Sequence, residues 1–155
     1  MLGRMAEILI SAARRIEAAA DVVYHCLADY REHHRPGGFL PPAFSDFEVE
    51  QGGVGSGTVI RFTTTLGGRA RRARQTVSEP WPGRVLVEAG DGASTTFTVE
   101  PDGGACRVRF DTRLEAHGLE GLLLRLVAPR LLRPLYADEL ARLERHAQAH
   151  ALTDA

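Results

Sequence analysis

Lysine and asparagine are both absent from this 155-residue sequence, and cysteine occurs only twice. All 19 basic residues are therefore arginine, which excludes lysine Schiff-base chemistry, and the lack of asparagine excludes N-glycosylation. Cys26 and Cys106 lie far apart and belong to no CxxC or Cys/His metal spacing. This spacing favours two reduced, buried cysteines, and we expect neither a metal nor a cofactor.

The sequence also lacks an excess of charge and a long uninterrupted apolar run. Its 19 basic and 20 acidic residues leave a net charge of -1, which offers no long-range attraction to nucleic acid or to an anionic membrane. The longest apolar stretch, residues 119–135, contains four charged residues and is not expected to insert into a bilayer. Residues 8–10 form too short an apolar run for a signal peptide. We therefore expect a cytoplasmic protein.

The composition is that of a globular domain, with 44% hydrophobic and 25% charged residues. A chain of this length usually builds a single core. We expect one domain over residues 7–150, with flexible termini at 1–6 and 151–155. Composition does not separate a monomer from a homodimer.

The start of the chain predicts a strand followed by two short helices. Residues 7–17 have the apolar alternation of a strand. Asp21 is the predicted N-cap of a helix whose apolar residues recur at helical spacing up to Tyr30. A second short helical turn is expected before Pro36.

Between residues 44 and 116 the apolar period changes to two, and Gly- and Pro-rich turns divide the segment into six predicted antiparallel strands. Their ranges are 44–51, 58–66, 69–79, 84–89, 94–100 and 106–116. Alternation places apolar and hydroxyl-bearing side chains on the inner face of the last strand: Cys106, Val108, Phe110, Thr112 and Leu114. The same alternation assigns further residues to the inner faces of two other strands: Thr58, Ile60, Phe62, Thr64, Leu66, Thr95, Phe97 and Val99.

After Gly118 the spacing becomes helical and continues almost to the C-terminus. The apolar residues of this predicted amphipathic helix are Leu119, Leu122, Leu123, Leu126, Leu132, Tyr136, Leu140 and Leu143. Pro129 and Pro134 each remove a backbone donor, so we expect a kink near them as the helix bends over the sheet.

Several local motifs accompany this order of elements. They are Ile16-Glu17-Ala18, Asp21-Val22-Val23-Tyr24, Leu27-Ala28-Asp29, residues 53–57, Val77-Ser78-Glu79-Pro80 and residues 97–104. Over about residues 8–149, the chain resembles the polyketide cyclase/dehydrase-like group of the SRPBCC (START/Bet v 1-like) superfamily. In one respect it departs from that pattern, because His33 and His34 occupy a stretch where many relatives have a tryptophan.

The resemblance implies an α+β helix-grip fold. In that fold a seven-stranded, curved antiparallel sheet wraps around a long, kinked C-terminal helix, and two short helices follow the first strand. Members of the superfamily commonly leave a cavity between sheet and helix, which implies a hydrophobic small molecule as the partner.

Motifs of other enzyme classes do not occur. The glycine cluster at residues 52–57 fails the spacing of phosphate-binding loops and links two strands, so a turn or β-bulge is expected. We identify neither a GxSxG nor an HExxH motif, and no paired-histidine metal spacing. Hydrolase and zinc-enzyme functions therefore lack support.

The candidate ligand-binding residues lie on the predicted inner surface. They are Tyr30, Ile60, Phe62, Thr64, Gln75, Val77, Phe97, Phe110, Thr112, Leu123, Leu126 and Tyr136. For proton transfer, the candidate catalytic residues are His33, His34, Arg71 and Tyr136. The histidines also fit a simple exposed turn, and Arg71 fits either a solvated strand position or an anchor for an anionic group.

Three functions are compatible with this pattern. The first is the binding or carriage of a lipid, polyketide or isoprenoid-like molecule in an internal cavity, which requires no reacting residues. The second is a cofactor-independent cyclase or dehydratase, which requires a proton-transfer group beside the substrate. The third is a protein-interaction module, which would show an exposed apolar patch.

Overall fold

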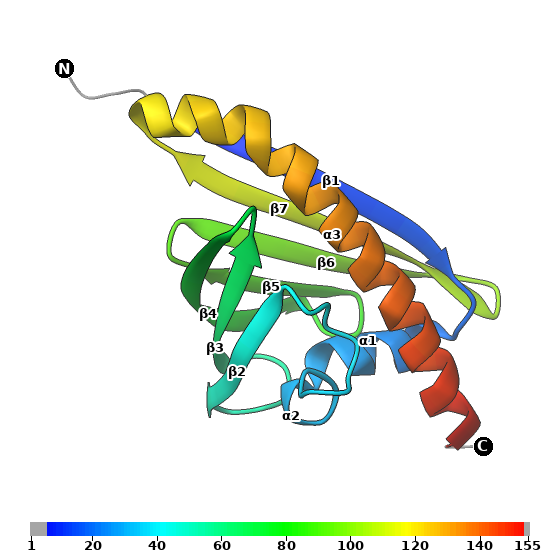
Figure 1. The fold of residues 1–155 in the computed structure, drawn as a ribbon. Coiled ribbons are helices and arrows are strands. Elements are labelled where there is room, and N and C mark those ends of the chain that lie inside the picture. The colour runs from blue at the N-terminus through cyan, green and yellow to red at the C-terminus, as the bar shows by residue number, and fades with distance from the viewer. Residues whose placement is uncertain (1–5, 154–155) are drawn as a thin grey trace.

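The computed structural model describes residues 6–153, which form one seven-stranded sheet and three helices (Figure 1). In chain order the elements are β1 (Ala6–Ile16), α1 (Ala20–Ala28), α2 (Tyr30–His33), β2 (Phe44–Gln51), β3 (Val59–Leu66), β4 (Arg69–Trp81), β5 (Val85–Gly90), β6 (Ala93–Asp102), β7 (Ala105–Ala116) and α3 (Gly118–Thr153). Residues 1–5 and 154–155, which belong to the predicted flexible termini, lie outside the described part of the chain.

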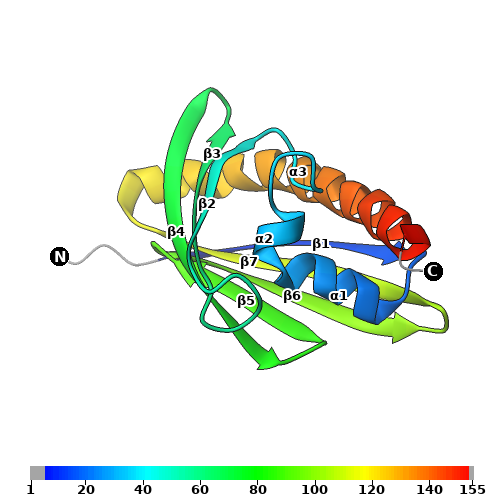
Figure 2. The same ribbon diagram turned by 90° about the horizontal axis from the view of Figure 1, so that it is seen from below.

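The sheet is antiparallel throughout, with the strand order β1-β7-β6-β5-β4-β3-β2. Successive hairpins build β2 to β7, and β1 pairs with β7 along its whole length. Figure 2 shows β3 and β4 rising out of the plane of β1, β7 and β6, while α3 lies over the concave side. This arrangement confirms the helix-grip fold and the two short helices after the first strand.

The first of the two short helices has a different N-terminal cap from the one predicted. Helix α1 begins at Ala20, one residue before Asp21, and its N-cap Ala19 makes no side-chain capping hydrogen bond. The prediction of Asp21 as N-cap is therefore wrong, because its carboxylate lies inside the first turn and accepts from the Val22 N–H. Asp29 is the capping residue of this region, since its carboxylate accepts from the Glu32 N–H at the start of α2.

The core lies between the concave face of the sheet and the second half of α3. The predicted inner face of β7 is confirmed at Cys106, Val108 and Phe110, which are fully buried. Leu140 and Leu143 cover them from α3 with at most 1% of their surface exposed. Burial on this scale is the main source of stability for a domain of this size.

The first half of α3 presents a different face from the one predicted. Its buried positions include Gly121, Ala128 and Leu135, whereas the four predicted leucines are between 60% and 87% exposed: Leu119, Leu122, Leu123 and Leu126. The helix is thus rotated about its axis relative to the predicted orientation. The absence of a side chain at Gly121 contributes to this rotation, because a Cβ there would lie 2.9 Å from the backbone carbon of Ala116. At Gly121 the helix lies so close to the end of β7 that no larger side chain fits between them.

Helix α3 continues through Pro129 and Pro134 without interruption. Its axis changes direction in the half that contains the two prolines (Figure 1), as expected from the backbone donors that they remove. Within residues 6–153, no helix is both long and apolar enough to cross a membrane.

The glycine-rich segment at 52–57 is the loop between β2 and β3, as predicted. Gly55 has a φ of +65°, and a Cβ at this position would collide with the Glu79 carboxylate. That carboxylate instead accepts a hydrogen bond of 2.8 Å from the Ser56 N–H, which ties the loop to β4. The loop also joins the two short helices, because its Gly53 carbonyl accepts from the Tyr30 N–H and its Gly55 N–H donates to the Ala28 carbonyl.

Candidate functional site

Three polar side chains form a row across the concave face of the sheet. The strand register places Glu88 of β5 opposite Thr95 of β6, and Thr95 opposite Thr112 of β7. Glu88 shares its face with Leu86, which is fully buried. The hydroxyls of Thr95 and Thr112 share a hydrogen bond of 2.8 Å.

Side chains from two helices complete this row. Tyr136 of α3 shares a hydrogen bond of 2.7 Å with the Thr112 hydroxyl, and Glu139 lies on the same side of α3, three residues further along. Tyr30 of α2 donates a hydrogen bond of 2.6 Å to the Glu88 carboxyl. We call the six residues the interior polar band: Tyr30, Glu88, Thr95, Thr112, Tyr136 and Glu139.

The two carboxyls of the interior polar band have strongly perturbed acidity. Burial raises the pKa of Glu88 to about 7, although the hydrogen bond from Tyr30 partly opposes this shift. Burial raises the pKa of Glu139 to about 8, and the negative charges of Glu88 and Asp138 add to the effect. Near neutral pH, Glu139 is therefore mostly protonated and able to donate a hydrogen bond.

Glu139 also lacks a partner. It is only 6% exposed, yet its carboxyl forms no hydrogen bond or ion pair with any other residue in the range 6–153. Its oxygens are not fully enclosed, because His33 Nε2 is the one fully buried side-chain nitrogen or oxygen without a partner among residues 6–153. The Glu139 carboxyl is therefore the member of the band with free capacity to form a hydrogen bond to a bound molecule.

The hydrogen bond between Tyr30 and Glu88 leads to a direct test. The Tyr30→Phe variant leaves the Glu88 carboxyl buried without its donor, so we expect a loss of about 1–3 kcal/mol in the free energy of unfolding. The pKa of Glu88 should rise further, because the lost hydrogen bond lowers it in the parent protein. Urea denaturation and NMR titration of the Glu88 carboxyl carbon measure the two effects.

Tyr24→Phe is the matched control, since the Tyr24 hydroxyl donates to a different carboxyl, that of Glu79, at 2.6 Å. We expect this control to leave the Glu88 titration unchanged. An unaltered Glu88 titration in Tyr30→Phe would contradict the assigned contact.

Most of the predicted ligand-binding residues lie inside the molecule. Those buried in the core or in the interior polar band are Tyr30, Ile60, Gln75, Val77, Phe97, Phe110, Thr112 and Tyr136. Phe110 links the sheet to the helix, because its ring contacts both Phe97 and Tyr136 edge to face. Burial raises the pKa of Tyr136 to about 12, so its hydroxyl stays protonated.

The other predicted site residues are more accessible. Phe62 and Thr64 on β3 are half-buried, and Phe62 stacks on Phe47. Leu123 and Leu126 are each 64% exposed, so the prediction that they lie on the inner surface is wrong. Arg71 is exposed near the β3–β4 turn, and its role stays a prediction.

The paired histidines are buried and do not lie in an exposed turn. His34 is 5% exposed, shares a hydrogen bond of 2.9 Å with the Leu27 carbonyl, and packs against Tyr30. Burial lowers the pKa of His34 to about 3 and that of His33 to about 4, so both rings are neutral at pH 7. Of the four candidate proton-transfer residues, Tyr136 is the one that belongs to the interior polar band.

Sequence analysis missed both carboxyls of the band, although the signals were present. In the strand at 84–89, Glu88 has the same parity as Leu86 and therefore faces inward with it. Glu139 is three residues after Tyr136 and one before Leu140, which places it on the buried stripe of the helix. Charged residues are usually assigned to solvent, and that expectation fails here.

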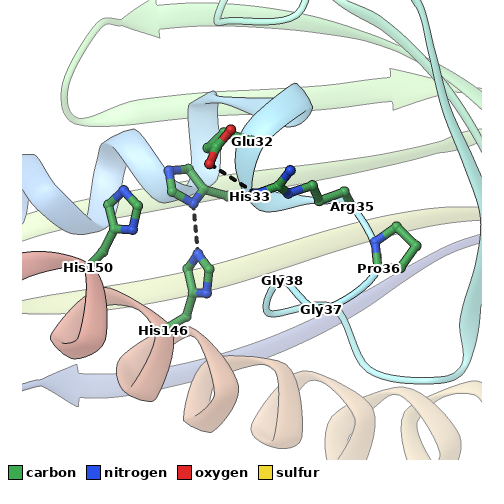
Figure 3. A pocket seen from close by; sticks show the side chains of 8 residues that line it. All are labelled: Glu32, His33, Arg35, Pro36, Gly37, Gly38, His146 and His150. Carbon is green, nitrogen blue, oxygen red and sulfur yellow. Dashed lines mark hydrogen bonds and ion pairs between the residues drawn. The ribbon is translucent and has the colours of Figure 1, made fainter. Parts of the chain in front are cut away.

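Two surface hollows are lined by residues of the described range 6–153. One, of about 260 Å³, is lined by the residues in Figure 3, among them His33, His146 and His150. The other, of about 800 Å³, lies between α1 and the turn after β4, and Tyr24 and Trp81 contribute to it. Both are separate from the interior polar band.

The fold and the site together define a helix-grip protein with ionisable groups inside its sheet-to-helix interface. The chain belongs to the family described as polyketide cyclase / dehydrase and lipid transport, which matches residues 7–148. The family assignment confirms the resemblance to the SRPBCC superfamily. A comparison with curated proteins finds no match.

Solved structures share this fold over nearly the whole chain. The KanY protein is 26% identical with a TM-score of 0.78, covering 92% of this chain and 99% of its own. A protein from Thermus thermophilus is 20% identical with a TM-score of 0.72, covering 92% and 98%. Norcoclaurine synthase from Thalictrum flavum, in complex with a transition-state analogue, is 17% identical with a TM-score of 0.71, covering 96% and 98%.

Proposed function

We propose that this protein binds or carries a hydrophobic small molecule with at least one oxygen substituent, held between the concave face of the sheet and α3. The observation that supports the proposal best is the Glu139 carboxyl, which is buried beside other polar groups and has no partner within residues 6–153. Lipid, polyketide and isoprenoid-like compounds have the required chemistry, an apolar body with a few oxygens. The family description, which includes lipid transport, is consistent with such a ligand.

The surroundings of the band suit the apolar part of that ligand. Several apolar residues pack against the core yet remain half-buried: Phe62, Leu114, Leu124 and Leu132. They come from β3, β7 and α3. Binding sites for small molecules commonly combine such apolar surfaces with a few placed polar groups.

Ligand binding can be tested with a defined panel of fatty acids, aromatic polyketides and isoprenoid alcohols. We expect native mass spectrometry to detect a stoichiometric complex with at least one class, and the compound to raise the melting temperature. Glu139→Leu should weaken binding by roughly 10-fold, the equivalent of one lost hydrogen bond.

Glu100→Gln is the control, because Glu100 is exposed on β6 and should leave affinity unchanged. If no compound binds, or if Glu139→Leu binds the same compound as well as the parent protein does, the proposed site is wrong.

A cofactor-independent cyclase or dehydratase is the second candidate function. The observation that favours it is the pair of carboxyls with pKa values of about 7 and about 8, which suits proton transfer near neutral pH. With a poly-β-keto thioester mimic as substrate, Glu139→Gln should lower the turnover rate by about 10²- to 10⁴-fold, the usual contribution of a general acid or base. Turnover that survives this change would show that Glu139 is not the acid or base, and a lack of turnover in the parent protein would leave binding as the function.

The exposed leucines of α3 are the feature that a protein-interaction module requires. Protein docking on the outer face of α3 would not involve the interior polar band, however, so the band favours small-molecule binding. The cytoplasmic location and the oligomeric state stay predictions from the sequence.

A further inference from the structure

Four potential metal ligands from three helices meet beside the smaller surface hollow. Cys26 comes from α1, His33 from α2, and His146 and His150 from α3. Figure 3 shows the three imidazole rings gathered at one end of the hollow. The ring centroid of His33 lies 4.9 Å from that of His146 and 4.5 Å from that of His150.

Three of the four ligand atoms are close enough to surround one ion. Cys26, His33 and His146 each offer one ligand atom, and these three atoms all lie within 4.8 Å of one another. His33 Nδ1 and His146 Nε2 are joined by a hydrogen bond of 2.7 Å. In a tetrahedral zinc site, with bonds of about 2.0 Å to nitrogen and about 2.3 Å to sulfur, neighbouring ligand atoms are about 3.5 Å apart. Side-chain movements of about 1 Å would therefore bring these three atoms to bonding positions. His150, whose ring centroid lies 5.8 Å from that of His146, would have to move further to supply the fourth ligand.

A second, independent observation points to a missing partner. His33 is only 1% exposed, and its Nε2 atom is buried with no hydrogen-bond partner within the described residues 6–153. Buried polar atoms are almost always paired, and an unpaired one calls for an explanation such as an ion. The orphaned nitrogen thus belongs to the residue around which the other ligands gather.

The chemistry of the four groups selects the kind of ion. Imidazole and thiolate ligands suit zinc and similar borderline transition metals, whereas calcium and magnesium prefer oxygen. His146 and His150 are four residues apart on one helix and therefore share a face, a histidine pair that sequence analysis overlooked. Burial and the neighbouring histidines lower the pKa values of His33 and His146, which leaves both rings neutral and able to coordinate.

We propose that Cys26, His33, His146 and His150 form a tetrahedral site for a divalent transition metal, with Zn²⁺ as the expected ion. The hollow of about 260 Å³, also lined by Glu32 and Arg35, is its entry path. A bound ion would fasten the C-terminal half of α3 to α1 and α2. This site is separate from the interior polar band, so it does not depend on the proposed function.

A competing ligand set shares His33. His25, Asp29 and His33 also bring their ligand atoms within 4.8 Å of one another. The His25 side chain is 56% exposed, however, and Asp29 already caps α2. The buried set with a thiolate is therefore the better site, and the two sets predict different sensitivities to mutation.

The test uses the full chain after treatment with a chelator. We expect one equivalent of Zn²⁺ to bind in competition with a chromophoric chelator and to raise the melting temperature by several degrees. Co²⁺ should give the visible absorption of a tetrahedral site and a near-ultraviolet thiolate charge-transfer band. His146→Ala should weaken Zn²⁺ binding on the order of 100-fold or more, and Cys26→Ser should remove the charge-transfer band.

Two control variants make the result decisive. His117→Ala removes an exposed histidine outside the cluster and should leave Zn²⁺ binding unchanged, as should His25→Ala. His146 is only half-buried, and the metal-free melting temperature of His146→Ala shows whether the variant is folded. The proposal is overturned by the lack of stoichiometric binding, by undiminished binding in folded His146→Ala, or by a loss of binding in His25→Ala.

Discussion

Raising the pH from about 5 to about 9 is expected to destabilise the parent protein much more than the Glu139→Gln variant. The pKa of Glu139 is raised to about 8 in the folded protein, far above the usual value of 4.5. The folded state therefore keeps a proton that the unfolded state releases over this interval. The contribution of this carboxyl to the free energy of unfolding is fully present below about pH 4.5, and it is lost as the pH rises through about 8.

The expected magnitude follows from the size of the pKa shift. Each unit corresponds to about 1.4 kcal/mol, so Glu139 alone should account for on the order of 3–5 kcal/mol between pH 5 and pH 9. The groups that face or adjoin it are Glu88 on β5, Asp138 and Tyr136 on α3, and Tyr30 on α2. Glutamine is neutral at every pH, so the difference between the two pH profiles isolates the Glu139 carboxyl.

Urea denaturation across this pH range measures the effect in both proteins. Glu100→Gln, an exposed substitution on β6, serves as the control and should follow the parent profile. Parallel profiles for the parent protein and Glu139→Gln would show that the carboxyl is not held neutral inside the fold. The interior polar band would then lose its proposed proton donor.

Replacing Leu143 with alanine should lower the free energy of unfolding by about 2–5 kcal/mol. Leu143 is fully buried and covers the core from the second half of α3. The substitution removes the apolar contacts and leaves a cavity that the neighbouring strands fill only in part. Circular dichroism during urea denaturation provides the measurement.

Leu122→Ala is the matched control on the same helix. Leu122 is 60% exposed, so the same chemical change should alter stability by no more than about 0.5 kcal/mol. The sequence pattern alone placed both leucines on one apolar stripe. Equal losses of unfolding free energy in the two variants would support the predicted single stripe and contradict the observed rotation of α3.

The order and ranges of the elements were predictable because their signals are local. Glycine and proline mark the turns between β2 and β7, and the alternation in β7 identifies its inner residues Cys106 to Leu114. The prediction of Asp21 as the N-cap was wrong for a local reason as well. The alanines that precede Asp21 are good helix formers, so the helix begins one residue earlier. The resemblance to a known family depended on the same turns, caps and core positions.

The site was only partly predictable, because it depends on side chains that are distant in the sequence. Thr112 and Tyr136 were identified by their periodicity, but their contact depends on how α3 lies over β7. Glu88 and Glu139 were overlooked because a carboxylate is normally assigned to solvent. Their burial follows from the register of β5 and from the rotation of the helix.

By itself, the sequence determined which segments are strands and helices, the order in which they follow one another, and the absence of lysine and asparagine chemistry. Periodicity and turn residues act over a few positions, so they are readable without the fold. Only the tertiary structure decided which face of α3 is buried, because Gly121 lets the start of the helix lie close to the end of β7 and Ala128 is buried on the same side. The same packing gathers the acids of the interior polar band and the cysteine and histidines of three helices, since proximity across a core is a property of the whole chain.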